Sequence, residues 1–372
     1  MQQRVFTFTR QPRKGQRRRN PETGHSAPAF PPAWSLLLLL TLVVSASAHP
    51  ATASLARYEF TLPRMGTLVR LVLYAPEEGQ AQRAATAVFD RIEELEDILS
   101  DYREASELNR LTREAVNRPQ AVSPELFYVL TQSQKFSQLS GGAFDITIGP
   151  VVALWREARR TQRLPEAARL AKARELVDYH HIELDPEART VMLKRAGMQL
   201  DLGGIAKGYA ADQAIEILQA QGIHTALVAL GGDIRVSGTP PGTRGWKIDI
   251  QNPAPQGREP LCTVPLQGGA ISTSGDTQQY VESGGERLSH IINPASGMAL
   301  RNAASTTVIA PDGITADALA TALSVMPVER GLRLIESVEG ASAFIVRRTG
   351  KGFQYSRSRG FPSACGDPQE ME

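Results

Sequence analysis

The sequence predicts one α+β domain over residues 49–346, built from two lobes that pack closely together. Segments that alternate apolar and polar residues, as β-strands do, recur along the chain, and stretches with helical spacing of apolar residues lie between them. No linker and no internal repeat interrupts the chain between Tyr58 and Val346. The length of 372 residues allows one large domain or two moderate ones. With 42% hydrophobic and 22% charged residues, the composition is that of an ordinary globular protein.

The first 48 residues have the pattern of a basic leader followed by a signal peptide. Seven Lys and Arg residues precede the apolar run Trp34–Val44, and the small residues of Ser45–Ala48 suit cleavage before His49. The run has the length of a signal-peptide core and is short for a membrane span, so an uncleaved anchor is the weaker alternative. No cysteine stands directly after the run, where a lipid anchor would be attached. We therefore expect an exported, periplasmic protein.

The charge of the chain is unevenly distributed. Of 41 Lys and Arg and 39 Asp and Glu residues, the first 48 positions hold seven and one, which leaves 34 basic against 38 acidic residues. The remainder is weakly acidic, which argues against nucleic acid as a partner.

The first part of the domain reads as a hairpin followed by helices. Residues 58–74 predict two strands around the turn Met65-Gly66-Thr67, and Ala81–Leu99 predicts an amphipathic helix that ends at a polar turn carrying Tyr102. Three further helical segments are expected: one beginning at Ser106, one between Ser123 and Gly141-Gly142, and a charged one over residues 165–178.

The central motif is Gln199–Ala214, QLDLGGIAKGYAADQA. An apolar, strand-like approach reaches Asp201, two glycines break the strand, and a helix opens at Ile205–Gly208 and continues to about Gln221. A carboxylate, bare amides, a lysine and a helix N-terminus together favour phosphate binding. An ordinary strand-to-helix turn with a surface lysine explains the same residues.

The second half predicts mostly strands. Expected strands lie in 225–236 (a hairpin), 245–250, 268–281, 287–294 and 306–310. Thr315 is the expected N-cap of a helix over Ala316–Met326, with Asp317 and Thr321 together on the face opposite its apolar stripe. An acid and a hydroxyl one turn apart suit a hard cation, although an acid on the outer face of a first helical turn is a plain alternative.

The remaining features carry weaker signals. A last helix and strand are expected over 331–346, and the basic, Ser- and Gly-rich residues 347–372 predict a disordered tail. His180 and His181 read as surface or structural residues, and the absence of HExxH and CxxC argues against zinc. Cys262 and Cys365 could pair in an exported protein, or both could be free.

Several motifs, in one order along the chain, together resemble the FAD:protein FMN transferases, the ApbE-type flavin transferases. The matching segments are MGT (65–67), SDYREASELNRL (100–111), SGGAFDITIGP (140–150), DLGGIAKGYAAD (201–212), LGGD (230–233), STSGD (272–276), SHIINPASG (289–297) and TADALATAL (315–323). The resemblance implies a T-fold-like α+β domain with mixed or antiparallel sheets that binds FAD between its lobes with Mg²⁺ on the pyrophosphate. It also implies transfer of FMN, through a phosphoester, to a threonine of an acceptor protein, with release of AMP.

The resemblance also assigns residues. It implies flavin-nucleotide contacts at Met65, Tyr102, Ala143, Phe144, Asp145, Asp201, Lys207, His290 and Ile291. It implies Mg²⁺ ligands at Gly204, Asp317 and Thr321, and catalytic roles for His290 and Asp317. Asn293 stands where many members have Asp, which leaves the hydrogen-bonding shape without the charge. The acceptor that the resemblance suggests is a membrane-associated redox subunit.

The chemistry of these residues is consistent with that implication. Phosphoryl transfer needs charge neutralisation on the phosphates and a base or orienting group for the nucleophile. Lys207 and the amides after Gly203 suit the phosphates, and His290 suits the threonine proton, although a hydrogen-bonded histidine at a strand end is the plainer interpretation. Two other functions stay open: an FAD pyrophosphatase that forms FMN and AMP, and a non-catalytic exported protein that binds or carries FAD.

Overall fold

The computed structural model describes residues 54–254, 259–275, 280–283, 286–301, 303–350 and 352–365. Its centre is an eight-stranded sheet with the order β1-β2-β6-β7-β10-β13-β14-β15, and every pairing in it is antiparallel. The strands are β1 (Ala56–Arg64), β2 (Thr67–Ala75), β6 (Ala226–Leu230), β7 (Asp233–Ser237), β10 (Gly269–Gly275), β13 (Ala303–Ala310), β14 (Ser342–Thr349) and β15 (Gly352–Arg357). The prediction of an α+β fold with antiparallel pairing is confirmed.

Apolar side chains cover both faces of this sheet. Successive side chains of a strand point to opposite faces, and Leu71 and Leu73 belong to one buried cluster whereas Val72 belongs to another. Along β14, Ile345 and Phe344 divide between the same two clusters. The central strands are therefore apolar on both sides.

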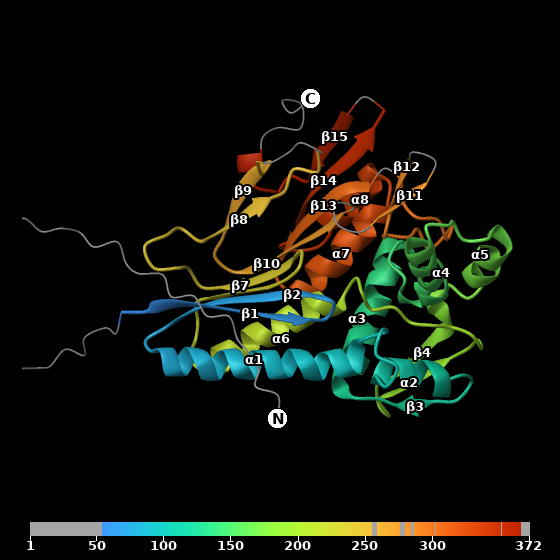
Figure 1. The fold of residues 1–372 in the computed structure, drawn as a ribbon, viewed down its shortest axis with the longest axis horizontal. Coiled ribbons are helices and arrows are strands. Elements are labelled where there is room, and N and C mark those ends of the chain that lie inside the picture. Colours follow the sequence, from blue (N-terminus) through green and yellow to red (C-terminus); the bar gives the residue numbers. More distant parts are fainter. Residues whose placement is uncertain are drawn as a thin grey trace, which may run out of the picture.

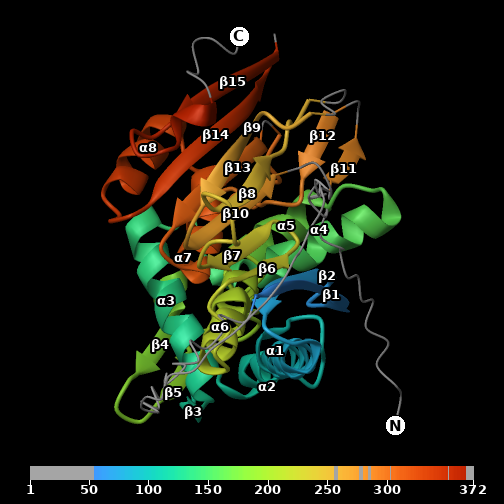
Figure 2. The ribbon, with the colours of Figure 1, turned by 90° about the vertical axis from the view of Figure 1, so that its left-hand side faces the viewer.

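Helices cover one face. Figures 1 and 2 show α1 (Glu78–Leu99), α6 (Ala206–Ala220) and α7 (Gly313–Val325) on this side of the sheet. The other helices are α2 (Glu107–Glu114), α3 (Pro124–Ser140), α4 (Gly149–Thr161), α5 (Ala167–Arg174) and α8 (Val328–Glu336), with 3-10 turns η1 (Ile146–Ile148), η2 (Tyr179–His181) and η3 (Ser363–Cys365). The predicted helix starts at Ser106 and Ser123 are confirmed: both residues are N-caps, and their side chains accept hydrogen bonds from Asn109 N and Leu126 N.

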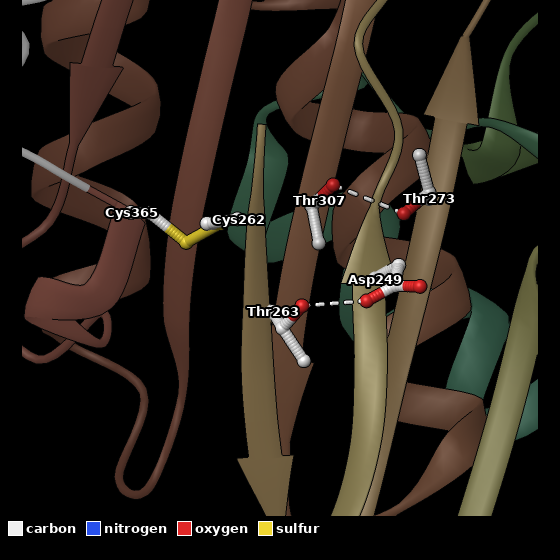
Figure 3. Close-up of a disulfide and its surroundings, with 6 residues drawn as sticks. All are labelled: Asp249, Cys262, Thr263, Thr273, Thr307 and Cys365. Atoms are coloured by element: carbon white, nitrogen blue, oxygen red, sulfur yellow. Dashed lines mark hydrogen bonds between the residues drawn. A yellow bond between two sulfur atoms is a disulfide. The ribbon is translucent and has the colours of Figure 1, made fainter. Parts of the chain in front are cut away.

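A small hairpin covers the opposite face. It consists of β8 (Trp246–Ile250) and β9 (Cys262–Leu266), whose apolar side chains join those of β14 in the second cluster (Figure 1). A disulfide joins Cys262 of this hairpin to Cys365 of η3, 103 residues later in the chain (Figure 3). Of the alternatives that the sequence left open for the two cysteines, the paired one is correct.

The expected disordered tail beginning at Arg347 is wrong as far as residue 365. Arg347 lies within β14, and β15 pairs with it over Phe344 to Thr349. Phe361 is buried and stacks on Phe344, and the disulfide fastens the segment at Cys365. Composition suggested a tail because these residues are polar and basic, but their backbone completes the edge of the sheet. Residues 366–372 lie outside the described part of the chain, as do residues 1–53.

The described residues also form two smaller sheets. One is three-stranded, with β3 (Gln120–Ala121), β5 (Thr190–Leu193) and β4 (Ile182–Asp185), and the other pairs β11 (Tyr280–Ser283) with β12 (Glu286–Ser289). A third apolar cluster packs Leu288, Ile292 and Ala299 against Val151 and Trp155 of α4. The chain that follows β12 is therefore held on α4.

Two local predictions need correction. The strand expected to reach Asp201 ends at Leu193. Residues 198–202 form an irregular segment in which Met198, Leu200 and Leu202 are buried, and a hydrogen bond from Asp201 N to Ile146 O, 2.8 Å, holds it. The N-cap of α7 is Asp312 and not Thr315, because the Asp312 carboxylate accepts from Thr315 N at 2.9 Å. Within the part of the chain that the structure describes, no helix is long and apolar enough to cross a membrane.

Candidate active site

The candidate site is built where α6 and α7 cross. The two helices meet at glycines: a Cβ on Gly208 would lie 2.1 Å from the carbonyl oxygen of Gly313, and one on Gly313 would lie 2.4 Å from the carbonyl oxygen of Gly208. Any larger residue would push the helices apart. The crossing therefore brings the residues at the start of α6 against the side chains of α7.

Asp212 fixes the orientation of α7. Its carboxylate, carried by α6, accepts hydrogen bonds from Gly313 N (2.7 Å) and Ile314 N (2.9 Å) and from Arg235 Nε (2.9 Å). These two amides belong to the first turn of α7, where the helix has free N–H groups. Burial raises the pKa of Asp212 to about 6, although the amides and Arg235 oppose that rise. Asp212 lies in a motif of the resemblance but carries no role among the predicted site residues.

Asp317 is buried beneath this crossing. It is 2% exposed, and its Oδ2 accepts a hydrogen bond from Gly208 N at 3.0 Å. Burial raises its pKa, and the nearby carboxylate of Asp233 raises it further, against the opposing effect of Lys207. The plain alternative of an acid on the outer face of its helix is wrong, because α7 packs against α6 on one side and against β10 and β13 on the other.

Lys207 supplies positive charge beside Asp317. Its Nζ makes an ion pair with Asp233 of β7 and lies 3.8 Å from Asp317 Oδ2. Burial lowers the pKa of Lys207, but the two carboxylates outweigh burial and raise it above its ordinary value, so the side chain is charged at neutral pH. Ser272 of β10 donates to the other oxygen of Asp233, at 2.5 Å. Asp233, which the sequence marked only as part of LGGD, thus anchors the lysine.

Gly204 and Thr321 lie against each other. A Cβ on Gly204 would come within 2.8 Å of Thr321 Oγ1 and 3.3 Å of Phe144 Cε2, so a side chain at position 204 would fill the space beside the hydroxyl. The predicted metal ligands Gly204, Thr321 and Asp317 are thereby brought to one crossing. Carboxylate, hydroxyl and peptide oxygens are donors that Mg²⁺ accepts. The residues present therefore fit a hard cation. Among the described residues, no group of three or more His, Cys, Asp or Glu could hold a metal alone.

A second cluster forms around Tyr102. This side chain is 74% exposed, and the guanidinium carbon of Arg156 lies 4.0 Å from its ring centroid. Arg156, from α4, donates to Asp201 Oδ2 at 2.8 Å and to Asp101 Oδ2. The other oxygen of Asp201 accepts from Gly203 N at 2.8 Å, so the carboxylate also shapes the turn before α6. The predicted contacts Tyr102 and Asp201 are thus joined through an arginine.

Ala143, Phe144 and Asp145 follow the end of α3. Phe144 is buried and packs edge-to-face on Phe136, with ring centroids 6.5 Å apart. Asp145 is also buried, and its carboxylate accepts hydrogen bonds from the amide and hydroxyl of Thr147 and from Tyr179 N. Burial raises the pKa of Asp145, and these donors oppose the rise. Asp145 therefore braces the turn that sets Phe144 beside Gly204.

Met65 occupies the turn between β1 and β2. Both residues of this two-residue turn have positive φ, 49° for Met65 and 68° for Gly66, as a type I′ hairpin turn requires. A non-glycine residue at positive φ is uncommon. Met65 N donates to Glu96 Oε1 of α1 at 3.0 Å, which holds the strained position.

His290 and Ile291 directly follow β12. Ile291 is buried, and its amide donates to Ser289 Oγ at 3.1 Å. Downstream, the side chain of Asn293 accepts hydrogen bonds from Ala295 N and Ser296 N, a local turn that an uncharged amide oxygen can form. Trp155 of α4 donates to Gly297 O at 2.8 Å, so this loop is anchored on the helix that carries Arg156.

Helix α4 and its Arg156 were missed by sequence reasoning. Pro150 at the first turn and the apolar spacing of Val151, Trp155 and Ala158 were signals that could have found the helix. Nothing in the local sequence indicates that Arg156 reaches Asp101 and Asp201, which lie 55 and 45 residues away.

Comparison with known proteins places this chain among flavin transferases of similar sequence and fold. Residues 65–345 match the ApbE family. An FAD:protein FMN transferase from Vibrio cholerae is 32% identical over 332 residues, which is 88% of this chain and 97% of the relative, and one from Klebsiella pneumoniae is 32% identical over 78% of this chain and 89% of its own. The solved flavin transferase ApbE from Vibrio cholerae superposes with a TM-score of 0.72 at 31% identity, over 82% of this chain and 98% of that one. The apbe protein from Thermotoga maritima gives a TM-score of 0.75 at 30% identity, over 84% and 100%.

Proposed function

This chain belongs to the ApbE family, and from that premise we propose that it is an FAD:protein FMN transferase. In the proposed reaction, a threonine hydroxyl oxygen of an acceptor protein bonds to the phosphorus of the FMN half of FAD. The bond from this phosphorus to the bridging oxygen breaks, AMP leaves, and the hydroxyl proton passes to a base. The product is an FMN joined to the acceptor through a phosphoester.

The observation that carries the proposal is the glycine-mediated crossing of α6 and α7. It sets Gly204 and Lys207 against Asp317 and Thr321. One side of the crossing has a lysine and a helix N-terminus, which suit phosphate. The other has oxygen donors, which suit a hard cation. A pyrophosphate bound by both is the chemistry that cleavage of FAD needs.

We assign Mg²⁺ to Gly204, Asp317 and Thr321; when bound, it would neutralise the negative charge that develops on the pyrophosphate. Lys207, anchored by Asp233, would neutralise further phosphate charge. His290 would accept the threonine proton. Tyr102, with Arg156 on one ring face, would offer the other to an aromatic ring of the nucleotide.

The decisive experiment is incubation of the protein with FAD, Mg²⁺ and an acceptor protein bearing a candidate threonine, followed by mass spectrometry. The proposal expects one FMN on that threonine and an equal amount of AMP, and none on an acceptor that lacks the threonine. Asp317→Asn should abolish transfer, whereas Asp249→Asn, which alters an exposed carboxylate on β8, should not. Free FMN with AMP would identify a pyrophosphatase instead, and intact FAD would identify a binding protein.

We also propose that the protein is exported to the periplasm. The leader pattern over residues 1–48 predicts it, and a disulfide between Cys262 and Cys365 is typical of oxidising compartments. The acceptor that the family resemblance suggests is a membrane-associated redox subunit, and we propose that it lies in the same compartment. Cell fractionation with detection of the mature N-terminus tests it: a cytoplasmic, uncleaved chain would contradict the proposal.

A further inference from the structure

We propose that Arg156 is a positioning residue for the flavin nucleotide, one that orders the Tyr102 ring and clamps Asp101 and Asp201 beside it. The inference rests on the proposed function, because it assigns a task within the FAD site. It concerns Arg156 of α4, which lies outside the motifs that carry the family resemblance.

The first support is the geometry of the guanidinium. Its central carbon lies 4.0 Å from the Tyr102 ring centroid, while its two terminal nitrogens donate to Asp101 Oδ2 and Asp201 Oδ2. An arginine fork is planar, so the two carboxylates fix its plane and the plane in turn fixes the stacked ring. Tyr102 is otherwise 74% exposed and would sample several rotamers without this support.

The second support is electrostatic. The side chains of Asp101 and Asp201 are only 15% and 10% exposed, and they repel each other. Burial raises the pKa of Asp101, and Asp201 raises it further, whereas Arg156 lowers it. A single cation paired with both acids therefore offsets the repulsion between them and holds them in place. Without it, Asp201 would lose a partner on the oxygen that does not accept from Gly203 N.

The third support is the space beside the ring. A surface hollow of about 350 Å³ is lined by Asp101, Tyr102, Asn109 and Gln199, among others. Its size is within the range of small-molecule sites. Because Arg156 covers one face of Tyr102, the opposite face is the one left for a planar ligand, and stacking of a ring there would complete a three-layer arrangement of guanidinium, phenol and ligand.

The fourth support is the place of α4 in the fold. Arg156 follows Trp155, whose indole donates to Gly297 O in the loop after His290. Two adjacent residues of α4 thus contact the Tyr102 ring and the loop after His290. A shift of α4 would move both together.

The test measures FAD affinity by calorimetry, without Mg²⁺ or acceptor. We expect Arg156→Met to weaken binding about tenfold, the scale of a lost cation–π support with its ion pairs. Arg156→Lys should give an intermediate affinity, because lysine restores the charge but not the planar fork. Arg160→Met, the same change at an exposed arginine of α4, should bind as wild type does.

A double-mutant cycle separates positioning from a general structural role. In a Tyr102→Leu background, Arg156→Met should weaken FAD binding less than it does in the wild-type background, because the part of its effect that passes through the ring is already lost. Equal losses from Arg156→Met with and without Tyr102, wild-type affinity in Arg156→Met, or the same loss in Arg160→Met would each overturn the inference. If the wild-type protein binds no FAD, the proposed function fails and this inference fails with it, whereas the other outcomes leave the proposed function intact.

Discussion

Gly208→Ala should both destabilise the protein and disable the proposed site. A Cβ at this position would lie 2.1 Å from Gly313 O and 2.8 Å from Asp317 Cβ. Ordinary contact begins near 3.4 Å, so the helices must separate by about 1.3 Å at the crossing. Backbone atoms cannot swing away as the end of a side chain can, and the whole of α7 must move.

The expected magnitudes follow from this displacement. Overpacking of this kind costs about 1–3 kcal/mol, and the better helix propensity of alanine returns about 1 kcal/mol at most. The free energy of unfolding should therefore fall by up to about 3 kcal/mol, or by up to about 2 kcal/mol where the gain in helix propensity is complete. Because a shift of about 1 Å in reacting groups can cost roughly 100-fold in rate, FMN transfer should fall by about that factor in the fraction that remains folded.

Urea unfolding and the FMN-transfer assay together test the prediction. Gly79→Ala is the matched control: it is also helical, it lies on the exposed start of α1, and its new Cβ would contact only the flexible end of Arg83, at 3.4 Å. That variant should be at least as stable as wild type and fully active. A Gly208→Ala protein with wild-type stability and activity would refute the idea that the glycine contact sets the site.

Three further predictions concern other parts of the molecule. Burial raises the pKa of Asp212 in the folded protein to about 6. Between about pH 4 and 6 the unfolded chain releases this proton while the folded protein keeps it, so the free energy of unfolding should fall by at most about 3 kcal/mol as pH rises. Asp212→Asn should remove that decline in urea titrations at a series of pH values. Cys365→Ser should lower the free energy of unfolding by about 2–4 kcal/mol, with unchanged FAD affinity, because the disulfide closes a long loop outside the site; equal stability of oxidised and reduced wild type would contradict this. His290→Ala should reduce transfer about 100- to 10,000-fold while FAD still binds. His180→Ala, at an exposed histidine, should change neither transfer nor FAD binding.

Local sequence signals predicted much of the fold but not the environment of the site. The turn at Met65-Gly66 and the helix starts at Ser106 and Ser123 depend on adjacent residues, and the structure confirms all three. The burial of Asp317 depends on the other elements, α6, β10 and β13, that pack against α7. Helical periodicity compares the faces of one helix, so it cannot reveal a helix that is covered on both.

Long-range partners account for the other differences. Nothing near Cys262 or Cys365 in the sequence says that they meet, and nothing near Arg347 says that its strand gains β15 as a neighbour. Arg156 is the sharpest case, since both of its carboxylate partners come from other segments of the chain. Such pairs follow from the tertiary fold and not from composition or spacing.

The strand order of the main sheet has a consequence for how the chain can fold. From β1 to β15, each strand joins at the edge left by strands that precede it in the chain, and none is inserted between two earlier ones. A chain that emerges N-terminus first could therefore extend the sheet stepwise, with no completed pairing broken to admit a later strand. Cys365 comes near the end of this sequence of additions, so oxidation would seal a sheet whose last strand is already in place.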